Sequence, residues 1–534
     1  MHQLEQVLAL FFAAVLLSAA ARRLGAPYPV FLALGGAALA FVPGASSPSL
    51  PPDLVLALFV APVLLDAAYD ASLRDLRDNW APVTGLVVFA VVLTTAAVAV
   101  VAHALVPQMP WAAAIALGAI VAPPDAVAAT AVLRSLQPPR RILTILEGES
   151  LLNDASALLI YRLAVGAVAA GGFSVQAVVP AFLLAVIGSL VAGAALGWTV
   201  QRLIERVEHV PTAIIMQFVS TFTVWLVAER AGLSGVLTTV CYAMTLARRG
   251  PARISARIRL PTNAVWSTVI FALNIFAFIF IGLQIRPIVS SLPEPVREHY
   301  FRVAAAVLAT VILVRFAWHM SFNAVARWRD RRLGFHPPRP MMRATPGSGL
   351  VISWSGMRGI VTLAAALALP QEFPLRDLVV LTAFSVVLGT LVIQGLTLKP
   401  LLRVLDIRAG DPVRDELRIA QEGVLKAALA ALPAGPSAAL DLLRKDLKLR
   451  LSGLRETPAG AAGFIAGYAA GYSTALKAGR SALLAMRDRG DIGDEAFHTL
   501  ENDLDFMEVS DPFRAAPAGS GSASAREEDT GATG

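Results

Sequence analysis

Residues 142–170 read ILTILEGESLLNDASALLIYRLAVGAVAA. The run is long enough to cross the hydrocarbon core of a bilayer, which takes roughly 20 apolar residues in a helix. It nevertheless contains the ionisable side chains Glu147, Glu149, Asp154 and Arg162. A charge at this depth is costly and usually faces a protein interior or a water-filled path. The stretch therefore predicts a membrane-spanning helix that carries a functional site.

The rest of the chain has the composition of a helical membrane protein. Hydrophobic residues make up 56 % and charged residues 16 % of the 534 positions, whereas soluble proteins carry about a quarter charged residues. Between residue 4 and about residue 403 the apolar runs are long, and helices are the default there because lipid cannot satisfy backbone polar groups. Thirteen spans are predicted, at 4–21, 27–43, 53–70, 81–106, 111–133, 142–170, 177–201, 212–228, 233–247, 263–285, 301–326, 348–369 and 377–402. The predicted class is an all-α polytopic membrane protein.

The distribution of arginine predicts the orientation. Twenty arginines lie in one set of alternate loops, and five lie in the other set, namely Arg230, Arg286, Arg297, Arg302 and Arg376. Because positive loops stay cytoplasmic, the N-terminus is expected outside and the C-terminus inside a cell (inner) membrane. Arg22 and Arg23 follow the first apolar run and no Lys or Arg precedes it, which is the reverse of a signal peptide. The basic residues form no stripe with stacking aromatic residues, so no nucleic-acid partner is expected.

The composition changes after the last span, and three domains are predicted. Residues 1–403 form the transmembrane domain. Residues 404–514 are charged and amphipathic, with leucines at helical spacing from Leu440 to Leu451, and they predict a small helical cytoplasmic domain. Its role is open between a solvated appendage and a regulatory or assembly element. Residues 515–534 are rich in Ala, Gly and Ser, a composition typical of a disordered tail.

The fifth span contains the sequence APPDA at 122–126. Proline removes a backbone donor and clashes with the preceding helical turn, so the helix is expected to break around residues 120–125. Transporters place such discontinuous helices at the substrate site, where freed carbonyls and a helix N-terminus meet the substrate. Asp125 lies directly at this break. A simple proline kink is the alternative interpretation.

Four polar side chains of the sixth span lie about one helical turn apart: Glu149, Ser150, Asn153 and Asp154. Residues four apart share a helix face, which pairs Ser150 with Asp154 and Glu149 with Asn153. The carboxylates, hydroxyl and amide carbonyl are hard oxygen donors, which suit a small cation rather than a soft transition metal. The alternative is a polar contact between helices.

The twelfth span contains Arg358 between Gly356 and Gly359. A guanidinium in the membrane needs a partner, and a carboxylate is the natural one. We therefore expect Arg358 to hold one carboxylate and to leave another free to titrate. Arg315 and Arg162 also lie within spans, and we interpret them as snorkelling or structurally paired side chains.

Five segments resemble the sodium/proton exchanger family, and more narrowly the bacterial monovalent cation/proton antiporters with an Asn-Asp pair. They are APPDAV at 122–127, LEGESLLND at 146–154, LSGVL at 233–237, NIFAFIFIGLQ at 274–284 and GMRG at 356–359. Residues 491–508 also resemble the end of the cytoplasmic segment of the bacterial form. The resemblance covers nearly the whole chain, in the order of the family.

The resemblance implies a fold and an assembly. The family has thirteen transmembrane helices in two inverted six-helix repeats, with discontinuous helices 5 and 12 crossing at the centre. Its members are homodimers in which a core domain moves past a dimerisation domain.

The resemblance also implies roles for single residues. Asp154 alternately binds cation and proton. Asp125, Ser150 and the backbone carbonyl of Pro124 are the other expected ligands of the cation. Asn153, Glu149 and Arg358 support the site, with Glu149 paired to Arg358. Pro124 stands where the family commonly has threonine, so any ligand role of that side chain is lost here.

The expected function is exchange of a monovalent cation for H+ across the plasma membrane, with Na+ favoured over K+ or Li+. We expect no enzyme activity and no cofactor. Asn153 replaces the first of two adjacent aspartates found in electrogenic relatives, and no lysine precedes Lys399, so one-for-one electroneutral exchange is predicted. The alternatives are a cation channel and a non-transporting sensor or scaffold on the same fold.

Overall fold

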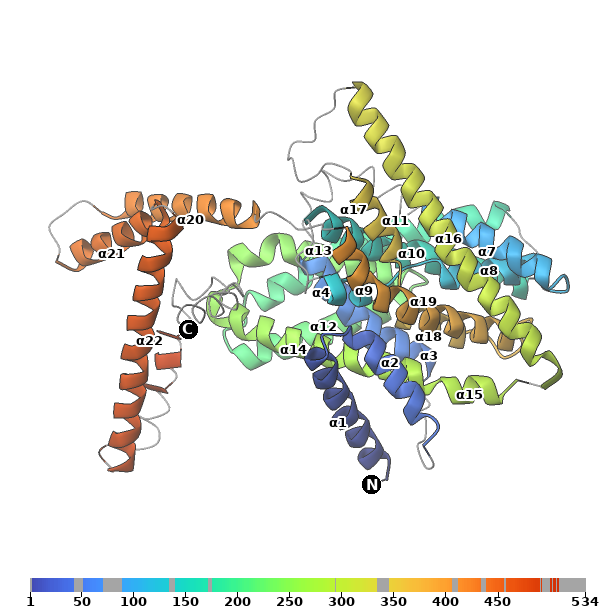
Figure 1. Ribbon diagram of the computed structural model, residues 1–534, viewed down its shortest axis with the longest axis horizontal. Coiled ribbons are helices and arrows are strands. Elements are labelled where there is room, and N and C mark those ends of the chain that lie inside the picture. The colour runs from blue at the N-terminus through green and yellow to red at the C-terminus, as the bar shows by residue number, and fades with distance from the viewer. Residues whose placement is uncertain are drawn as a thin grey trace, which may run out of the picture. The chain divides into compact units, whose positions relative to one another are not determined.

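The computed structural model describes residues 2–42, 51–70, 89–133, 140–170, 175–292, 294–333, 345–405, 412–433, 438–455, 458–489, 491, 500–501, 503–505 and 507–508. The chain divides into two compact units, Met1–Ala409 and Gly410–Gly534 (Figure 1). Every regular element of the described residues is helical, and none of them is a strand. The predicted all-α class is confirmed.

The first unit holds the helices of the predicted membrane domain. They are α1 His2–Arg23, α2 Tyr28–Leu39, α3 Pro52–Val55, the π-helix η1 Leu56–Val60, α4 Ala61–Asp70, α7 Val91–Leu105, α8 Trp111–Val121, α9 Ala126–Leu133, α10 Arg140–Ala169, α11 Val175–Ile204, α12 Val210–Arg230, α13 Gly235–Arg253, α14 Ala256–Leu283, α15 Ile285–Ser290, α16 Glu294–Leu333, α17 Pro346–Trp354, α18 Ile360–Leu367 and α19 Arg376–Val404. Each of the thirteen predicted spans contains helix over its described part.

Several of these helices are long and apolar enough to cross a bilayer unaided. Among the described residues they are Phe182–Ile204, Val210–Arg230, Arg257–Ser290, Glu294–Arg329 and Arg376–Val404. Shorter apolar helices accompany them, in α2, η1 with α4, α7, α8 and the second half of α10. The chain is therefore a multi-pass membrane protein. The count of thirteen crossings and the inverted repeat remain predictions.

Two helices are interrupted inside the bundle, at the places where the sequence breaks the helical pattern. The first interruption separates α8 from α9, at the two prolines of residues 122–125. The second separates α17 from α18, where the backbone of Gly359 is extended. The two breaks face each other, because the Asp125 N–H donates a hydrogen bond of 2.6 Å to the Met357 carbonyl. The predicted break in the fifth span is confirmed, and it is more than a kink.

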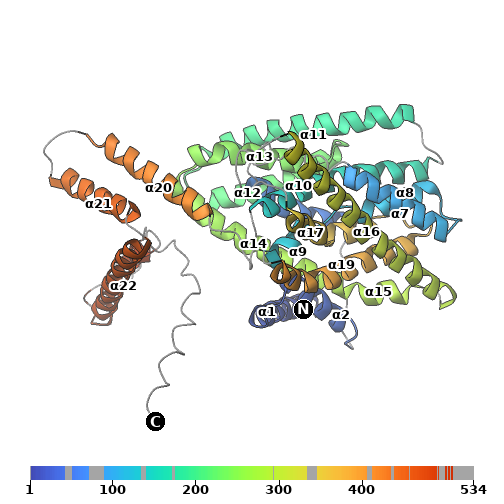
Figure 2. The ribbon, with the colours of Figure 1, turned by 45° about the horizontal axis from the view of Figure 1, so that its top comes forward.

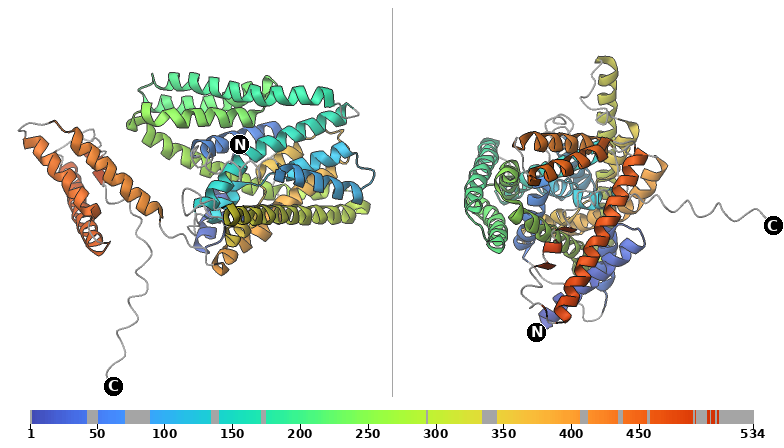
Figure 3. Two further views of the ribbon diagram at one scale, coloured as in Figure 1. Left: turned by 90° about the horizontal axis from the view of Figure 1, so that it is seen from above. Right: turned by 90° about the vertical axis from the view of Figure 1, so that its left-hand side faces the viewer.

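The apolar interior of the first unit falls mainly into two clusters. The first cluster is built largely from α8, α9, α10, α14 and α19, and it includes Leu117 and, from α16, Val311. The second cluster is built from α4, α12, α13 and one end of α14 and includes Trp225, Tyr242 and Trp266. Figure 3 (left) shows α11 and α13 on one margin of this unit and α16 on the opposite margin. Helix α14 contributes to both clusters, and the other helices pack mainly with one of them, so they form two packed groups, one around each cluster.

Glycines let α11 and α13 approach closely beside the second cluster (Figure 2). A Cβ added to Gly193 would lie 2.5 Å from the Thr238 carbonyl oxygen, and one added to Gly197 would lie 2.8 Å from the Thr245 side chain. Small residues at helix contacts are the usual means of packing in lipid, where no hydrophobic drive joins the helices. The α11–α13 pair is thus a tightly packed element.

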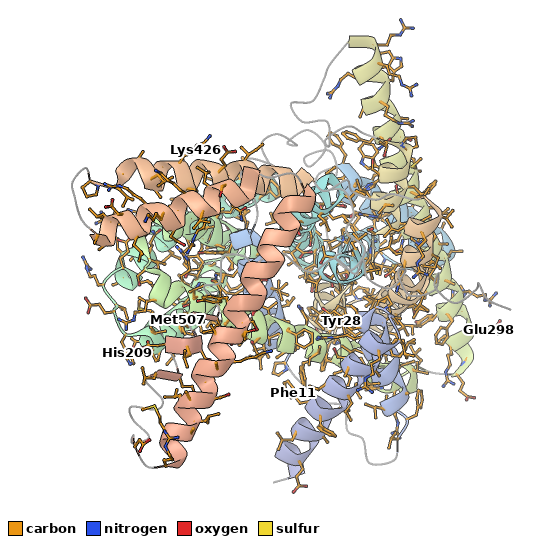
Figure 4. The ribbon with its side chains drawn as sticks, turned by 60° about the vertical axis from the view of Figure 1, so that its left-hand side comes forward. Phe11, Tyr28, His209, Glu298, Lys426 and Met507 are labelled. Carbon is orange, nitrogen blue, oxygen red and sulfur yellow. The ribbon has the colours of Figure 1, made fainter. Side chains whose placement is uncertain are left out.

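The second unit contains α20 Pro412–Ala431, α21 Ala438–Arg455 and α22 Pro458–Asp488. Residues that follow α22 pack back on it, since Arg480 forms ion pairs with Asp505 and Glu508, and the Tyr472 hydroxyl donates to the Met507 carbonyl. Met507 is labelled beside α22 in Figure 4. The predicted boundary at residue 403 and the cytoplasmic location of this unit remain predictions. The predicted tail 515–534 lies outside the described residues.

Candidate functional site

A cavity of about 300 Å³ lies between the two clusters of the first unit. One wall comes from the α8–α9 break, α10 and the start of α18, and the other from η1, α4 and α14, together with Tyr28 of α2. Tyr28 is labelled in Figure 4. Four residues predicted as cation ligands line it together: Pro124, Asp125, Ser150 and Asp154. Their roles as ligands remain predictions, but the fold brings them to one place.

The Asp125 carboxylate is held by the break itself. The N–H of Val127 donates a hydrogen bond of 2.8 Å to Asp125 Oδ1 at the start of α9. The other oxygen lies against the second break, where a Cβ added to Gly359 would be only 1.7 Å from Asp125 Oδ2. The glycine of the GMRG segment is therefore required for the carboxylate to occupy this position.

Asp154 faces the same cavity from α10 and is 7 % exposed. Among the described residues, no basic side chain forms an ion pair with Asp154 and no donor is hydrogen-bonded to it. Asp125 and Asp154 thus line the same cavity, without an arginine or lysine among the described residues to neutralise Asp154. Such a space attracts a positive charge, because an isolated carboxylate in a medium of low dielectric constant is costly.

The donor set of the cavity consists of oxygen atoms. Asp66 and Glu147, which also lie within predicted spans, line it as well, together with Asn274 and Thr362. No described part of the chain brings three or more His, Cys, Asp or Glu side chains into a metal-binding group. Carboxylate, hydroxyl and amide oxygens without thiolate or imidazole suit a hard cation.

The expected partner of Glu149 was wrong. Its carboxylate forms a two-pronged ion pair with Arg315 of α16, with 2.8 Å from Arg315 Nη2 to Glu149 Oε2. Arg315 is 3 % exposed, so it neither snorkels nor faces solvent. The sequence placed three arginines within spans, Arg162, Arg315 and Arg358, and only the tertiary structure shows that the side chain of Arg315 reaches Glu149.

Asn153 belongs to this buried ion pair rather than to the cavity. Its Nδ2 donates to Glu149 Oε1 over 3.2 Å. His319, one turn beyond Arg315 on α16, places Nε2 3.9 Å from the same oxygen. Sequence reasoning overlooked His319, although its i,i+4 spacing to Arg315 was visible. These contacts around Glu149 anchor the turn of α10 that directly precedes Asp154.

Arg358 has a different task from the expected one. Its Nε and Nη2 donate to the carbonyls of Val121 and Ala122 over 2.9 and 3.0 Å, and its Nη1 donates to Gly356. A helix that ends inside the membrane leaves its last carbonyls without partners. Arg358 satisfies them at the C-terminus of α8, where a positive charge also complements the helix dipole. The sequence contained a sign of this role, because a proline break in a helix leaves backbone carbonyls without partners.

Comparison with known proteins agrees with this geometry. Residues 7–404 match the family model described as sodium/hydrogen exchanger, transmembrane. The chain belongs to this family. An uncharacterized Na(+)/H(+) exchanger of Mycobacterium tuberculosis is 32 % identical over 76 % of this chain and 75 % of its own length.

Other exchangers are similar over much of the chain. A low-affinity Na(+)/H(+) antiporter of Synechocystis is 30 % identical over 76 % of this chain and 75 % of its own. A sodium, potassium, lithium and rubidium/H(+) antiporter of Bacillus subtilis is 28 % identical over 91 % of this chain and 75 % of its own. Among solved structures, the sodium proton antiporter MjNhaP1 of Methanocaldococcus jannaschii superposes with a TM-score of 0.57 at 17 % identity, covering 74 % of this chain and all of that one. That likeness identifies the fold.

The contact between Gly359 and Asp125 gives a first prediction for this sodium/hydrogen exchanger. Gly359→Ala should lower the transport efficiency, the ratio of maximal rate to KM, by at least about tenfold, because the added methyl group displaces a carboxylate of the cavity and misplacements of about 1 Å are severe at such sites. The measurement is cation/proton exchange in proteoliposomes. Gly166→Ala is the control, since a Cβ at Gly166 on α10 meets open space. Equal rates for the two variants would contradict the prediction.

Proposed function

We propose that this chain exchanges a monovalent cation for H+ across the plasma membrane, with Na+ as the first candidate and K+ or Li+ as alternatives. One observation carries the proposal. Asp154 and Asp125 line a single cavity, and Asp154 has no basic partner among the described residues. Membership of the sodium/hydrogen exchanger family and the antiport activities for which its relatives are named support the same function.

The mechanism is competition at Asp154. A dehydrated cation and a proton cannot both occupy one carboxylate favourably, so binding of either releases the other. Asp125, Ser150 and the backbone of Pro124 supply further oxygens to the cation. A bare carboxylate crossing the low-dielectric interior is too costly. If only the cation-bound or proton-bound site moves between the two membrane faces, exchange is obligatory.

The remaining site residues prepare this cavity. Glu149 is neutralised by Arg315 and therefore does not compete for the transported cation. Arg358 holds the broken end of α8, so the backbone next to Asp125 keeps its shape. Asn153 joins the buried ion pair to the Asp154 position. This division of labour leaves Asp154 as the exchangeable carboxylate of the proposed cycle.

The stoichiometry gives a second prediction. With one exchangeable carboxylate, the cycle should carry one cation against one proton and be electroneutral. An electrogenic cycle that moved one net charge would gain or lose about 2.3 kcal/mol per 100 mV of membrane potential. We expect the rate of Na+-driven proton release from proteoliposomes to stay unchanged when the potential is collapsed or imposed with a permeant lipophilic ion. A rate that follows the imposed potential would contradict one-for-one exchange. It would indicate that a second proton is carried in each cycle, and Asp125 would be the first candidate to carry it.

The function itself is tested with the purified chain in proteoliposomes that contain a pH-sensitive dye. An outward or inward gradient of NaCl, KCl or LiCl is imposed in turn, and choline chloride serves as the control. The proposal expects proton movement with at least one of the three cations and none with choline. Cation flux without proton movement would indicate a channel, and absence of both would favour the sensor or scaffold alternative.

The location and assembly are also proposed. The arginine distribution supports an outside N-terminus and a cytoplasmic C-terminus, and the family resemblance supports a homodimer in the cell membrane. Labelling of single cysteines introduced in opposite loops of intact cells tests the orientation. The mass of the protein in detergent tests the dimer.

A further inference from the structure

An ion pair joins α10 to α12 at a place that the proposed exchange cycle does not use. Arg162 lies two helical turns after Asp154 on α10, and its Nη2 donates to Glu229 Oε2 near the end of α12. Its Nη1 also donates to the Leu233 carbonyl over 3.1 Å. Arg162 is thus bound to both a side chain and the backbone of the α12–α13 connection.

The α12–α13 connection is built to present these acceptors. The second oxygen of Glu229 accepts from the Gly235 N–H over 3.0 Å. A Cβ added to Gly235 would lie 2.7 Å from Glu229 Oε1, so the close approach needs glycine. The Ser234 hydroxyl accepts from the Leu237 N–H at the start of α13, and the Ser234 N–H donates to the Ser189 hydroxyl of α11 over 2.9 Å. The LSGVL segment therefore fixes the position of Glu229.

Arg162 and Glu229 stand on different packed groups. Around Arg162, Tyr161 and Ala164 of α10 belong to the first cluster, while Leu158, one turn earlier, packs against both clusters. Near Glu229, Trp225 of α12 belongs to the second cluster. The cavity that contains Asp154 lies between the same two groups. The ion pair therefore joins the two groups across the interface that contains the cavity.

The two ion pairs of α10 differ in how far their charges are buried. Arg315 and Glu149 are 3 % and 0 % exposed, so separating them would leave buried charges unpaired. Arg162 and Glu229 are 43 % and 31 % exposed. Parting this pair would leave no unpaired charge in the protein interior, so it is the easier of the two pairs to open.

We propose that Arg162 and Glu229 form a latch between the two packed groups, which holds α10 at one height against α12 and α13 and must open in each exchange cycle. Arg162 is in this sense a positioning residue, since it does not reach the cation. The inference rests on the proposed function, and it adds an ion pair that must open before the site can move.

Reversible cross-linking tests the latch in the folded protein. The sequence has a single cysteine, Cys241, so Arg162→Cys/Glu229→Cys is built in a Cys241→Ala background. A bis-methanethiosulfonate reagent joins the two thiols and is removed by a reductant. We expect exchange in proteoliposomes to fall at least about tenfold on cross-linking and to return on reduction, because the two groups can no longer move past each other. A role in folding alone would give no reductant-dependent recovery.

Two results would overturn the latch. One is unchanged exchange after complete cross-linking, and the other is absence of exchange before cross-linking, because a latch is dispensable for the chemistry of the site. The charge swap Arg162→Glu/Glu229→Arg should also exchange faster than either single swap, and equal rates would contradict a pairwise role.

The Cys241→Ala parent separates the two proposals. If the parent itself shows no exchange, the proposed function fails. If it exchanges and cross-linking has no effect, only the latch fails.

Discussion

Asp154→Asn is expected to reduce cation/proton exchange in proteoliposomes to the background of protein-free vesicles, a loss of at least about a hundredfold. Asparagine keeps the shape of the side chain and removes both the charge and the exchangeable proton. The neutral amide can hold neither a proton nor a monovalent cation with comparable affinity. The cavity then keeps Asp125 and Ser150, but no competition at residue 154 remains.

The matched control for Asp154→Asn is Asp377→Asn, a carboxylate at the start of α19 that does not line the cavity. This control should exchange like the parent. Thermal unfolding gives an independent readout, since a bound cation stabilises the native state by mass action. NaCl should raise the unfolding temperature of the parent above that in choline chloride, and the difference should shrink in Asp154→Asn. Exchange retained above a tenth of the parental rate would reject the central assignment.

Arg315→Gln is expected to have the largest effect on stability. Removing one member of a buried ion pair leaves Glu149 charged and unpaired in the interior, which costs about 3–5 kcal/mol. The expected result is a clear fall in the unfolding temperature of the detergent-solubilised protein, followed by intrinsic tryptophan fluorescence. Exchange should fall as well, because the Glu149–Asn153 contact next to Asp154 loses its anchor.

A double variant distinguishes Arg315 from Arg358 as the partner of Glu149. Glu149→Gln should recover much of the stability lost in Arg315→Gln, because two neutral amides can hydrogen-bond in place of the ion pair. The same change should not rescue Arg358→Gln, whose loss comes from the unsatisfied carbonyls of Val121 and Ala122. Rescue of Arg358→Gln alone would restore the original expectation that Glu149 pairs with Arg358.

Local sequence was sufficient for the helices and for the interruption between α8 and α9, whereas the interruption between α17 and α18 was expected only from the family resemblance. Apolar length and the proline pair at residues 123 and 124 predicted where α8 ends and α9 begins, because helix formation and proline geometry depend on neighbouring residues only. The i,i+4 spacing on α10 likewise predicted that Ser150 and Asp154 share a face, and both line the cavity. These predictions depend on covalent geometry within a few turns, so they are readable from one segment.

The contacts between distant segments were not readable in this way. Arg315 and Glu149 are 166 positions apart, and Arg358 and Val121 are 237 apart. Each arginine is long enough to reach several acceptors, and charge pairing alone favoured the wrong one. Asn274 and Thr362 also line the cavity without any charge that would mark them, although Asn274 begins a segment that resembles the family.

The sequence by itself determined that residues 142–170 form an apolar helix with two carboxylates and an amide on adjoining faces, next to a helix that proline must break. Periodicity and backbone chemistry are local, and one chain segment contains all the information that they need. Only the tertiary structure decided that Arg315 neutralises Glu149, that Arg358 closes the end of α8, and that Gly359 makes room for Asp125. Those choices follow from which helices pack together, and packing sums many weak contacts along the whole chain.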